Sequence, residues 1–228
     1  MTTTNKIELL GHYGSDEIIA CSAWTSTSRN LTEEKKRRIP ALINQLWSAG
    51  HETPFEKGVV HFLVDSEIAS HIHLLKHRIA SINAESARYK ELKEDKFYIP
   101  QDWKGIPIQQ SIYFDYDGGV YEAESCDWTT ILEDYTELGN RLYHQCLAEL
   151  SPVLGRKRAK ESARYFKTYN SQIESDVMFN IRSFANFLHL RNSEHAQREI
   201  REIAVEMLRL VENIEGNPFE HTIKAITQ

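Results

Sequence analysis

Apolar residues recur along this chain at two spacings, and each spacing predicts a different kind of element. Four segments have apolar residues at helical intervals and are expected to form helices: Thr32–Ser48, Glu67–His77, Trp128–Leu150, and a final helix that turns Ala196, Ile200, Ile203, Met207 and Leu210 inward. Two short segments are strand-like: Lys6–Leu10 and Val59–Val64. Prolines, glycines and aromatic residues indicate strands or loops over Phe97–Val120. The predicted fold class is α+β, helix-rich, with a modest antiparallel or mixed sheet.

Local signals indicate where two of these helices begin and end. Glu33 and Glu34 lie in the first turn of the helix over Thr32–Ser48, where the helix dipole favours acidic side chains. Gly50 is expected to stop that helix, and Pro152 is expected to end the long helix that starts at residue 128. No repeat, low-complexity tract or linker interrupts the pattern, so we expect one domain over residues 1–228.

Composition limits the classes of protein to which the chain can belong. A formal net charge of -6 argues against a general nucleic-acid binder, and no apolar run approaches the roughly 20 residues that cross a bilayer. The first residues lack the apolar core of a signal peptide, so we expect a cytoplasmic protein that binds neither nucleic acid nor membrane. Cys21, Cys126 and Cys146 are too few and too scattered for a disulfide framework, and we expect plain thiols.

Two basic zones stand out within this acidic chain. The first covers residues 76–90, and the second covers residues 156–167, with six cations: Arg156, Lys157, Arg158, Lys160, Arg164 and Lys167. Acidic residues lie mostly elsewhere in the sequence, so the two zones could focus a small polyanion. From composition alone, a solvated helix face explains the first zone about equally well.

The first zone contains the segment KHRIASINAESARY over residues 76–89, which combines anion-binding and hydrogen-bonding groups at close spacing. Lys76 and Arg78 flank a histidine, and Ser86 and Arg88 follow further along. We expect a helix end that turns into a loop. Backbone N–H groups at helix ends, serine hydroxyls and a guanidinium fork together suit a phosphate. The segment therefore predicts a phosphorylated, planar ligand.

This segment resembles the R-H-R-x-x-S-x-N-x-x-S-x-R signature of flavin-dependent thymidylate synthases, the ThyX family. It matches every fixed position except the first, where Lys76 replaces arginine. Further blocks in the family's order are GHETPFE over residues 50–56, NIRSFANFLHLR over residues 180–191, and HAQREI over residues 195–200. The similarity extends from Cys21 to the end of the helix after Arg191. The resemblance implies a ThyX-like fold.

The resemblance also implies an activity, which is the FAD-dependent reductive methylation of dUMP to dTMP. In this family 5,10-methylenetetrahydrofolate supplies the carbon, and NADPH supplies the reducing equivalents through bound FAD, so these molecules are the expected partners. A homotetramer with shared active sites is implied as well. Such an assembly suits a chain of 228 residues, which is too small to enclose three large ligands unaided.

Matches to the family's substrate positions imply the residues that bind dUMP: His73, Lys76, Glu85, Ser86, Ala87, Arg88, Arg164 and Arg191. Arg191 is also the implied catalytic residue. A cation beside the pyrimidine favours its N3-deprotonated form and so enriches C5 in electron density. This electrostatic activation requires no nucleophilic cysteine.

Matches to the family's flavin positions imply the residues that bind FAD: Ser26, Thr53, Lys76, His77, Arg78, Ala84, Asn180, Arg182 and Asn186. Arg182 and Asn186 are four residues apart and would share one face of a helix. His51 and Tyr89 are expected to lie near the flavin and the folate.

Simpler interpretations of two of these groups stay open. Without the resemblance, Arg191 and His195 would be expected to pair on the surface with Glu194 or Glu199. Ser86 could be considered a nucleophile, but no base is identifiable beside it in the sequence. A hydrogen-bonding role suits Ser86 better.

The histidines at residues 71, 73 and 77 suggest a metal site, because His73 and His77 are one helical turn apart. Zinc helices of the H-E-x-x-H kind supply a base between the two histidines and a further ligand elsewhere. The chain shows no such pattern, so we expect no metal.

Three positions depart from the family pattern: Lys76 replaces arginine, Ala84 replaces a common glutamate, and His73 replaces a common glutamine. Lysine keeps the positive charge but loses bidentate geometry. These departures leave an alternative, a divergent member that acts on another pyrimidine nucleotide. A non-enzymatic flavin-binding or nucleotide-binding protein is a second alternative, which the presence of Arg191 disfavours.

Overall fold

The computed structural model describes residues 1–114 and 119–228. Its α-helices are α1 (Asp16–Trp24), α2 (Glu33–Ser48), α3 (Ile68–Leu74), α4 (Trp128–Leu154), α5 (Arg156–Ala163), α6 (Ile181–Arg191), α7 (Arg198–Glu212) and α8 (Glu220–Ile226). Its strands are β1 (Thr2–Thr3), β2 (Lys6–Tyr13), β3 (Val59–Glu67), β4 (Ser81–Ala84), β5 (Phe97–Tyr98), β6 (Ile112–Phe114), β7 (Gly119–Tyr121) and β8 (Gln172–Asn180). Short 3-10 helices are η1 (Thr53–Lys57), η2 (Gln101–Trp103) and η3 (Arg164–Phe166). The strands or loops predicted over Phe97–Val120 are found as β5, β6 and β7, but Gln101–Trp103 form the 3-10 helix η2, which was not predicted. Residues 115–118 lie outside the described residues.

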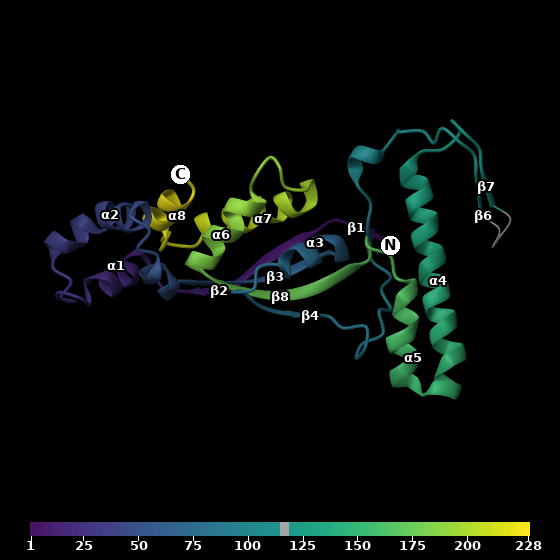
Figure 1. The fold of residues 1–228 in the computed structure, drawn as a ribbon, viewed down its shortest axis with the longest axis horizontal. Coiled ribbons are helices and arrows are strands. Elements are labelled where there is room, and N and C mark those ends of the chain that lie inside the picture. The colour runs from purple at the N-terminus through teal and green to yellow at the C-terminus, as the bar shows by residue number, and fades with distance from the viewer. Residues whose placement is uncertain (115–118) are drawn as a thin grey trace. The chain divides into compact units, whose positions relative to one another are not determined.

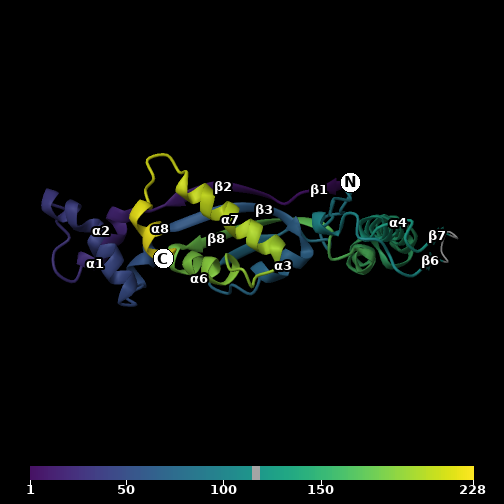
Figure 2. The same ribbon diagram turned by 90° about the horizontal axis from the view of Figure 1, so that it is seen from above.

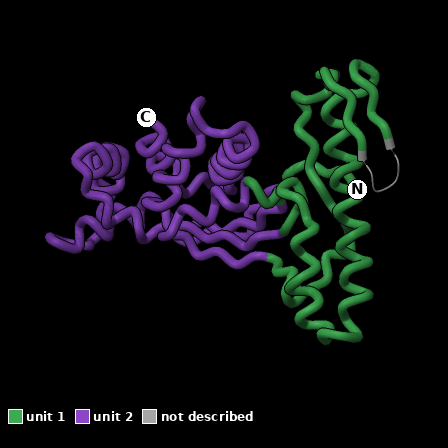
Figure 3. Tube along the Cα trace, turned by 45° about the vertical axis from the view of Figure 1, so that its right-hand side comes forward, with its two compact units in different colours: residues 1–5, 66–69, 85–173 green, residues 6–65, 70–84, 174–228 purple. Residues whose placement is uncertain are grey.

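Two compact units make up the described chain (Figure 3). Unit 1 contains residues 1–5, 66–69 and 85–173, and unit 2 contains residues 6–65, 70–84 and 174–228. Each unit therefore combines segments that are distant in the sequence, and each has its own cluster of buried apolar residues. The expectation of one domain over residues 1–228 stays a prediction.

A four-stranded sheet in the order β2-β3-β8-β4 belongs mainly to unit 2. β2 runs antiparallel to β3, with Lys6 opposite Asp65 and a bulge between Leu9 and Gly11, and β4 runs antiparallel to β8. α6 and α7 lie over one side of this sheet (Figures 1 and 2). Alternate residues of the two central strands are fully buried: Val60, Phe62, Val64, Val177 and Phe179. The helix-rich α+β prediction is thus confirmed.

The helices of unit 2 bury the apolar positions that their sequence spacing indicated. Phe184 and Phe187 of α6 are fully buried in the core of this unit. Ile200, Ile203 and Met207 of α7 are fully buried as well, while Ala196 and Leu210 are partly buried against the same core. The prediction of their inward direction is confirmed. In the part of the chain that the structure describes, none of the helices is both long and apolar enough to pass through a bilayer.

The basic signature differs from its predicted structure. β3 continues through Glu67 and α3 already ends at Leu74, so the helix predicted over Glu67–His77 is shorter. The sequence predicts a loop after it, but Ser81–Ala84 form β4, opposite Ser175–Met178 of β8. The backbone partners of β4 come from a strand about ninety residues later, and local sequence does not encode such pairing.

Unit 1 contains the helical pair α4 and α5, which lie side by side (Figure 1). Tyr143 is fully buried between them, with Leu147, Ala159 and Ala163 around it. The prediction that Pro152 ends the long helix is wrong, because α4 continues to Leu154. A proline this near a helix C-terminus removes only one backbone donor. Gly155, with a φ of 79°, makes the turn into α5 instead.

Gly58 lies at a tightly packed point within unit 2. A Cβ at this position would be 2.7 Å from Ile181 Cγ1 and 3.0 Å from Phe219 Cε1. We expect Gly58→Ala to lower the free energy of unfolding by about 1–3 kcal/mol, because the core must shift to admit one methyl group. Gly11→Ala is the matched control, because a Cβ there has open space. Equal denaturation midpoints for the two variants would contradict this expectation.

Candidate functional site

The N-terminal end of α6 positions two residues that were expected to bind the flavin. Asn180 caps the helix, because its Oδ1 accepts a hydrogen bond from the backbone N–H of Ser183 at 2.8 Å. Arg182 follows in the first turn and donates to the carboxylates of Glu52 and Glu56, each at 2.7 Å. Its side chain is 47% exposed. Each carboxylate accepts one hydrogen bond from this exposed guanidinium, and a phosphate oxygen can accept in place of either one.

The C-terminal end of α6 positions Arg191. Its Nε donates a hydrogen bond to Nε2 of His77 at 3.1 Å. His77 is only 7% exposed and packs edge-on against the ring of Phe187, with 5.0 Å between the ring centroids. Burial, the charge of Arg191 and the nearby His73 together lower the pKa of His77 to about 4. His77 is therefore neutral near physiological pH, and the direction of the guanidinium is fixed by a buried histidine rather than by surface glutamates.

His73 and the start of α7 lie at the same end of the site. Nε2 of His73 is 3.2 Å from Oε1 of Gln197, and Nε2 of Gln197 donates to Oε2 of Glu199 at 2.8 Å. Glu199 is 8% exposed. Gln197 and Glu199 were not predicted as site residues. The HAQREI block contained both, and its place directly after NIRSFANFLHLR was the signal that could have pointed to them.

The lowered pKa of His77 predicts a loss of stability in weak acid. A histidine has an ordinary pKa of 6.5, so between about pH 6.5 and about pH 4 the unfolded chain binds a proton that folded His77 does not. The free energy of unfolding should therefore fall as the pH drops through this window, on the order of 1 kcal/mol after solvent screening.

His77→Gln supplies the control for that measurement, because an amide does not titrate. The pH dependence of the unfolding midpoint should be shallower in this variant than in the original chain. Burial also lowers the pKa of His71, which therefore contributes in the same direction to both proteins. Identical pH profiles for the two proteins would contradict the expectation.

Unit 1 positions the residues that were expected to meet the phosphate of dUMP. Nε and Nη2 of Arg88 donate to Oε1 of Glu161 at 3.1 and 3.0 Å. The backbone N–H of Arg88 lies 3.4 Å from the hydroxyl oxygen of Ser86, and Lys160 donates to the carbonyl of Tyr89 at 2.7 Å. The loop that carries these residues is thus attached to α5. Glu161 is a site residue that the sequence did not single out.

Arg164 lies in the same unit, at the first position of η3 directly after α5, and it is exposed. Glu161 precedes it by one helical turn and already pairs with Arg88. Arg88 and Arg164 are thus two exposed arginines on segments that this ion pair joins. We refer to Ser86, Arg88 and Arg164 as the candidate phosphate residues.

The second basic zone is largely paired in space, although acidic residues lie mostly elsewhere in the sequence. Glu91 accepts from Arg156 at 2.8 Å. Asp95 accepts from Lys167 at 2.6 Å and lies 2.9 Å from Nε2 of His144. Lys167 is nearly buried, with 4% of its side chain exposed. The whole zone was expected to attract a polyanion, but only its exposed, unpaired cations are placed to do so.

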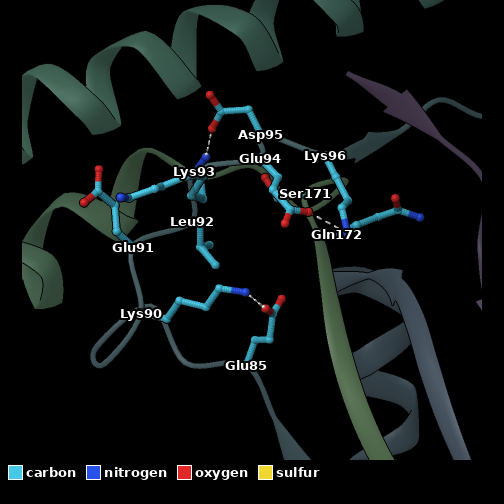
Figure 4. A pocket seen from close by; sticks show the side chains of 11 residues that line it. Glu85, Lys90, Glu91, Leu92, Lys93, Glu94, Asp95, Lys96, Ser171 and Gln172 are labelled. Carbon is cyan, nitrogen blue, oxygen red and sulfur yellow. Dashed lines mark hydrogen bonds and ion pairs between the residues drawn. The ribbon is translucent and has the colours of Figure 1, made fainter.

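A cavity of about 150 Å³ lies beside this segment of unit 1 (Figure 4). Its wall carries four lysines, at positions 90, 93, 96 and 167, and four acids, at positions 85, 91, 94 and 95. Lys90 pairs with Glu85, and Lys96 pairs with Glu94 at 2.8 Å. Because the charges balance, this cavity has no preference for an anion. Arg88 and Arg164, the exposed arginines among the candidate phosphate residues, suit a phosphate better.

α6 separates Arg182, an expected flavin residue, from Arg191, the expected pyrimidine residue, whereas another expected flavin residue, His77, contacts Arg191. Arg182 and Arg191 lie near opposite ends of this helix, about 13 Å apart along its axis. Asn186 is exposed one turn after Arg182, and Lys76 and Arg78 are exposed between α3 and β4. A ligand the size of a pyrimidine ring cannot touch both ends, whereas a ligand with the length of a dinucleotide can.

The remaining expected residues are distributed over unit 2 and the following loop. Thr53 begins η1, the short helix that contains Glu56, and His51 precedes it. Ala84 is the last residue of β4, and Glu85 and Ala87 follow in the loop of unit 1. The hydroxyl of Ser26 donates to the carbonyl of Ala23 at 3.2 Å, so it is used within its own turn.

The histidines that suggested a metal have other partners. His71 is buried and its Nδ1 lies 2.9 Å from the hydroxyl of Ser175. His73 and His77 make the contacts with Gln197 and Arg191 described above. Within the ranges 1–114 and 119–228, no group of three or more histidine, cysteine, aspartate or glutamate residues is placed to hold a metal ion.

The fold and these groups define a class of protein: an α+β protein with exposed arginines suited to phosphates and a fixed arginine suited to a polar ring. Comparison with known proteins gives the family. The model of the family described as thymidylate synthase complementing protein matches residues 8–215, and the chain belongs to this family.

Individual relatives agree with this assignment. The chain is 32% identical over 211 residues to the flavin-dependent thymidylate synthase of Pseudothermotoga lettingae, covering 91% of this chain and 85% of that one. It is 28% identical over 230 residues to the flavin-dependent thymidylate synthase of Clostridium tetani, covering 95% and 86%. Among solved structures, the UMP/dUMP methylase PolB from Streptomyces cacaoi bound with 5-Br dUMP has a TM-score of 0.76 at 26% identity, over 99% of this chain and 96% of that one.

Proposed function

We propose that this chain catalyses the reductive methylation of dUMP to dTMP, with FAD as cofactor, 5,10-methylenetetrahydrofolate as carbon donor and NADPH as reductant. Membership of the family and relatives named flavin-dependent thymidylate synthase support this activity. The observation that carries the proposal is the Arg191–His77 pair, in which a buried, neutral imidazole holds a guanidinium at the end of α6. A preorganised cation of this kind stabilises negative charge that develops on a ring during reaction.

In this mechanism the residues of the chain bind and polarise the substrate. Ser86, Ala87, Arg88 and Arg164 would hold the phosphate of dUMP through hydroxyl, backbone and guanidinium donors. Arg191 would lie at the uracil ring, favour its N3-deprotonated form and so raise the electron density at C5. His73, Lys76 and Glu85 would contact the same nucleotide. No covalent protein nucleophile is required.

The residues present fit a flavin dinucleotide. The exposed guanidinium of Arg182 faces two carboxylates that a pyrophosphate can replace, and Asn180, Thr53 and Asn186 offer polar side chains on or near the same helix end. Matches to the family add the following to this set: Ser26, Lys76, His77, Arg78 and Ala84, with His51 and Tyr89 near the flavin and folate. When bound, FAD would supply the reducing equivalents that originate in NADPH.

A homotetramer with shared active sites is part of this proposal. The expected flavin residues lie mainly in unit 2, whereas the candidate phosphate residues lie in unit 1. Arg88 and Arg164, the arginines expected at the phosphate of dUMP, therefore belong to a different unit from Arg182, the arginine expected at the flavin. Mass measurement of the native assembly by light scattering tests the subunit number, and a monomer with full activity would contradict shared sites.

A second candidate substrate is UMP. The structurally similar PolB from Streptomyces cacaoi is a UMP/dUMP methylase. This chain also departs from the family pattern at Lys76, Ala84 and His73. A parallel assay with the two nucleotides decides between them. A higher kcat/KM for UMP than for dUMP would make the ribonucleotide the principal substrate.

The direct test mixes the protein with FAD, dUMP, methylenetetrahydrofolate and NADPH. We expect dTMP to form and tritium to be released from C5-labelled dUMP. The purified protein should be yellow with noncovalent FAD. Bound FAD without any methylated product from either nucleotide would contradict the proposed activity.

A further inference from the structure

Gln197 lies between a carboxylate and an imidazole, and this position fixes the direction of its amide. Nε2 of Gln197 donates to Oε2 of Glu199 at 2.8 Å, and Oε1 of Gln197 lies 3.2 Å from Nε2 of His73. The amide NH₂ of Gln197, which only donates hydrogen bonds, thus faces the carboxylate of Glu199. The amide oxygen therefore faces His73, and it only accepts as well.

The direction of the amide determines the tautomer of His73. Because Oε1 of Gln197 accepts, Nε2 of neutral His73 must carry the hydrogen. Its Nδ1 is then a hydrogen-bond acceptor. Among the contacts of the described residues, Nδ1 of His73 has no side-chain or backbone partner, and the ring is only partly buried.

His77, four residues after His73, has the opposite tautomer. Nε–H of Arg191 donates to its Nε2, so the hydrogen of neutral His77 must be on Nδ1. Arg191 is hydrogen-bonded to His77, and His73 also contributes to the lowered pKa of His77. The two histidines are thus held in different tautomers by different partners.

We propose that Glu199, acting through Gln197, holds His73 in the tautomer with hydrogen on Nε2, so that Nδ1 accepts a hydrogen bond from an N–H or O–H group of the bound pyrimidine nucleotide. Glu199 and Gln197 are positioning residues in this scheme, and His73 is the residue that touches substrate. The ligand part of the inference rests on the proposed function. The tautomer part rests only on the contacts among these three side chains.

We refer to the chain of contacts from Glu199 through Gln197 to His73 as the relay. Two variants interrupt it at different points. Gln197→Ala removes the bridging amide, and Gln197 is exposed and makes no side-chain cap to α7, so the helix should persist. Glu199→Gln replaces an obligate acceptor by a group that can also donate, so the Gln197 amide loses its fixed direction. Because Glu199 is buried, circular dichroism should first establish that this variant folds.

The first measurement is ¹⁵N NMR of the imidazole nitrogens in the flavin-loaded protein above neutral pH, with His73 assigned by its absence from His73→Gln. In the original chain, Nε2 of His73 should be protonated and Nδ1 unprotonated, and His77 should show the reverse. Either relay variant should give a mixture of tautomers at His73 and leave His77 unchanged. A single Nδ1–H form of His73 in the original chain would overturn the proposal.

The second measurement is the KM for dUMP. We expect each relay variant to raise this KM roughly 3- to 10-fold with little change in kcat, which is the effect of weakening one hydrogen bond to the substrate. In a His73→Gln background, Gln197→Ala should cause no further increase, because the relay no longer has a target. A full additional increase there would refute the positioning role. If the original chain makes no dTMP, the activity fails while the NMR result still stands.

Discussion

Arg191→Ala is expected to lower kcat for dUMP methylation by roughly 10²- to 10³-fold, because it removes the only positive charge assigned to the pyrimidine ring. FAD binding should be largely retained. The expected flavin residues around Arg182 lie at the other end of α6, about 13 Å away along the helix axis. Flavin absorbance of the purified variant and single-turnover formation of dTMP measure the two properties separately.

Arg191→Lys is the matched control for this prediction. Lysine keeps the charge but has no Nε–H donor to aim at His77 and no planar fork. We expect activity between those of the original chain and the alanine variant. Wild-type turnover in Arg191→Ala, or loss of FAD with turnover per bound flavin unchanged, would contradict the assignment of Arg191 to the pyrimidine.

Arg88→Ala is expected to raise the KM for dUMP by roughly 10- to 100-fold, because charge-assisted hydrogen bonds to the phosphate are lost. The substitution also leaves the carboxylate of Glu161 without the guanidinium that it now holds at 3.0 Å. That carboxylate would then repel the substrate phosphate. Steady-state kinetics with dUMP measure the change.

Glu161→Gln distinguishes a substrate role of Arg88 from a purely structural ion pair. If Arg88 binds phosphate, Glu161 competes with the substrate for the guanidinium, and its neutralisation should lower the KM for dUMP by a few-fold. The two partners of one ion pair would then have opposite effects on KM. A structural ion pair predicts instead that both variants lose stability and that neither changes KM.

The secondary structure was predictable where a single element decides which residues are buried. The inward positions of α7, the extent of α2 and the strands β2 and β3 all follow from local spacing of apolar residues. Predictions were wrong where a partner from elsewhere in the chain intervenes. β4 is such a case, because it forms where β8 offers its backbone. The end of α4 is a different case, because the helix passes Pro152 and ends before Gly155, which is a neighbour in the sequence.

Prediction of the candidate site depended on short blocks of sequence in a fixed order. Those blocks identified the family, which the family model confirms, and they named the residues for the phosphate, the flavin and the pyrimidine. The roles of these individual residues stay predictions. The contacts of these residues could not be predicted from the sequence: Glu161 for Arg88, Glu52 and Glu56 for Arg182, and His77 for Arg191.

The sequence by itself determined the helix-rich α+β class and the family, and it predicted which side chains are chemically active. Only the tertiary structure decided how those side chains are held: Glu161 pairs with Arg88, Glu52 and Glu56 pair with Arg182, and His77 accepts a hydrogen bond from Arg191. The physical reason is that the spacing of apolar residues encodes which face of an element is buried. Contacts such as that between His77 and Arg191, 114 residues apart, arise only when separate elements pack together.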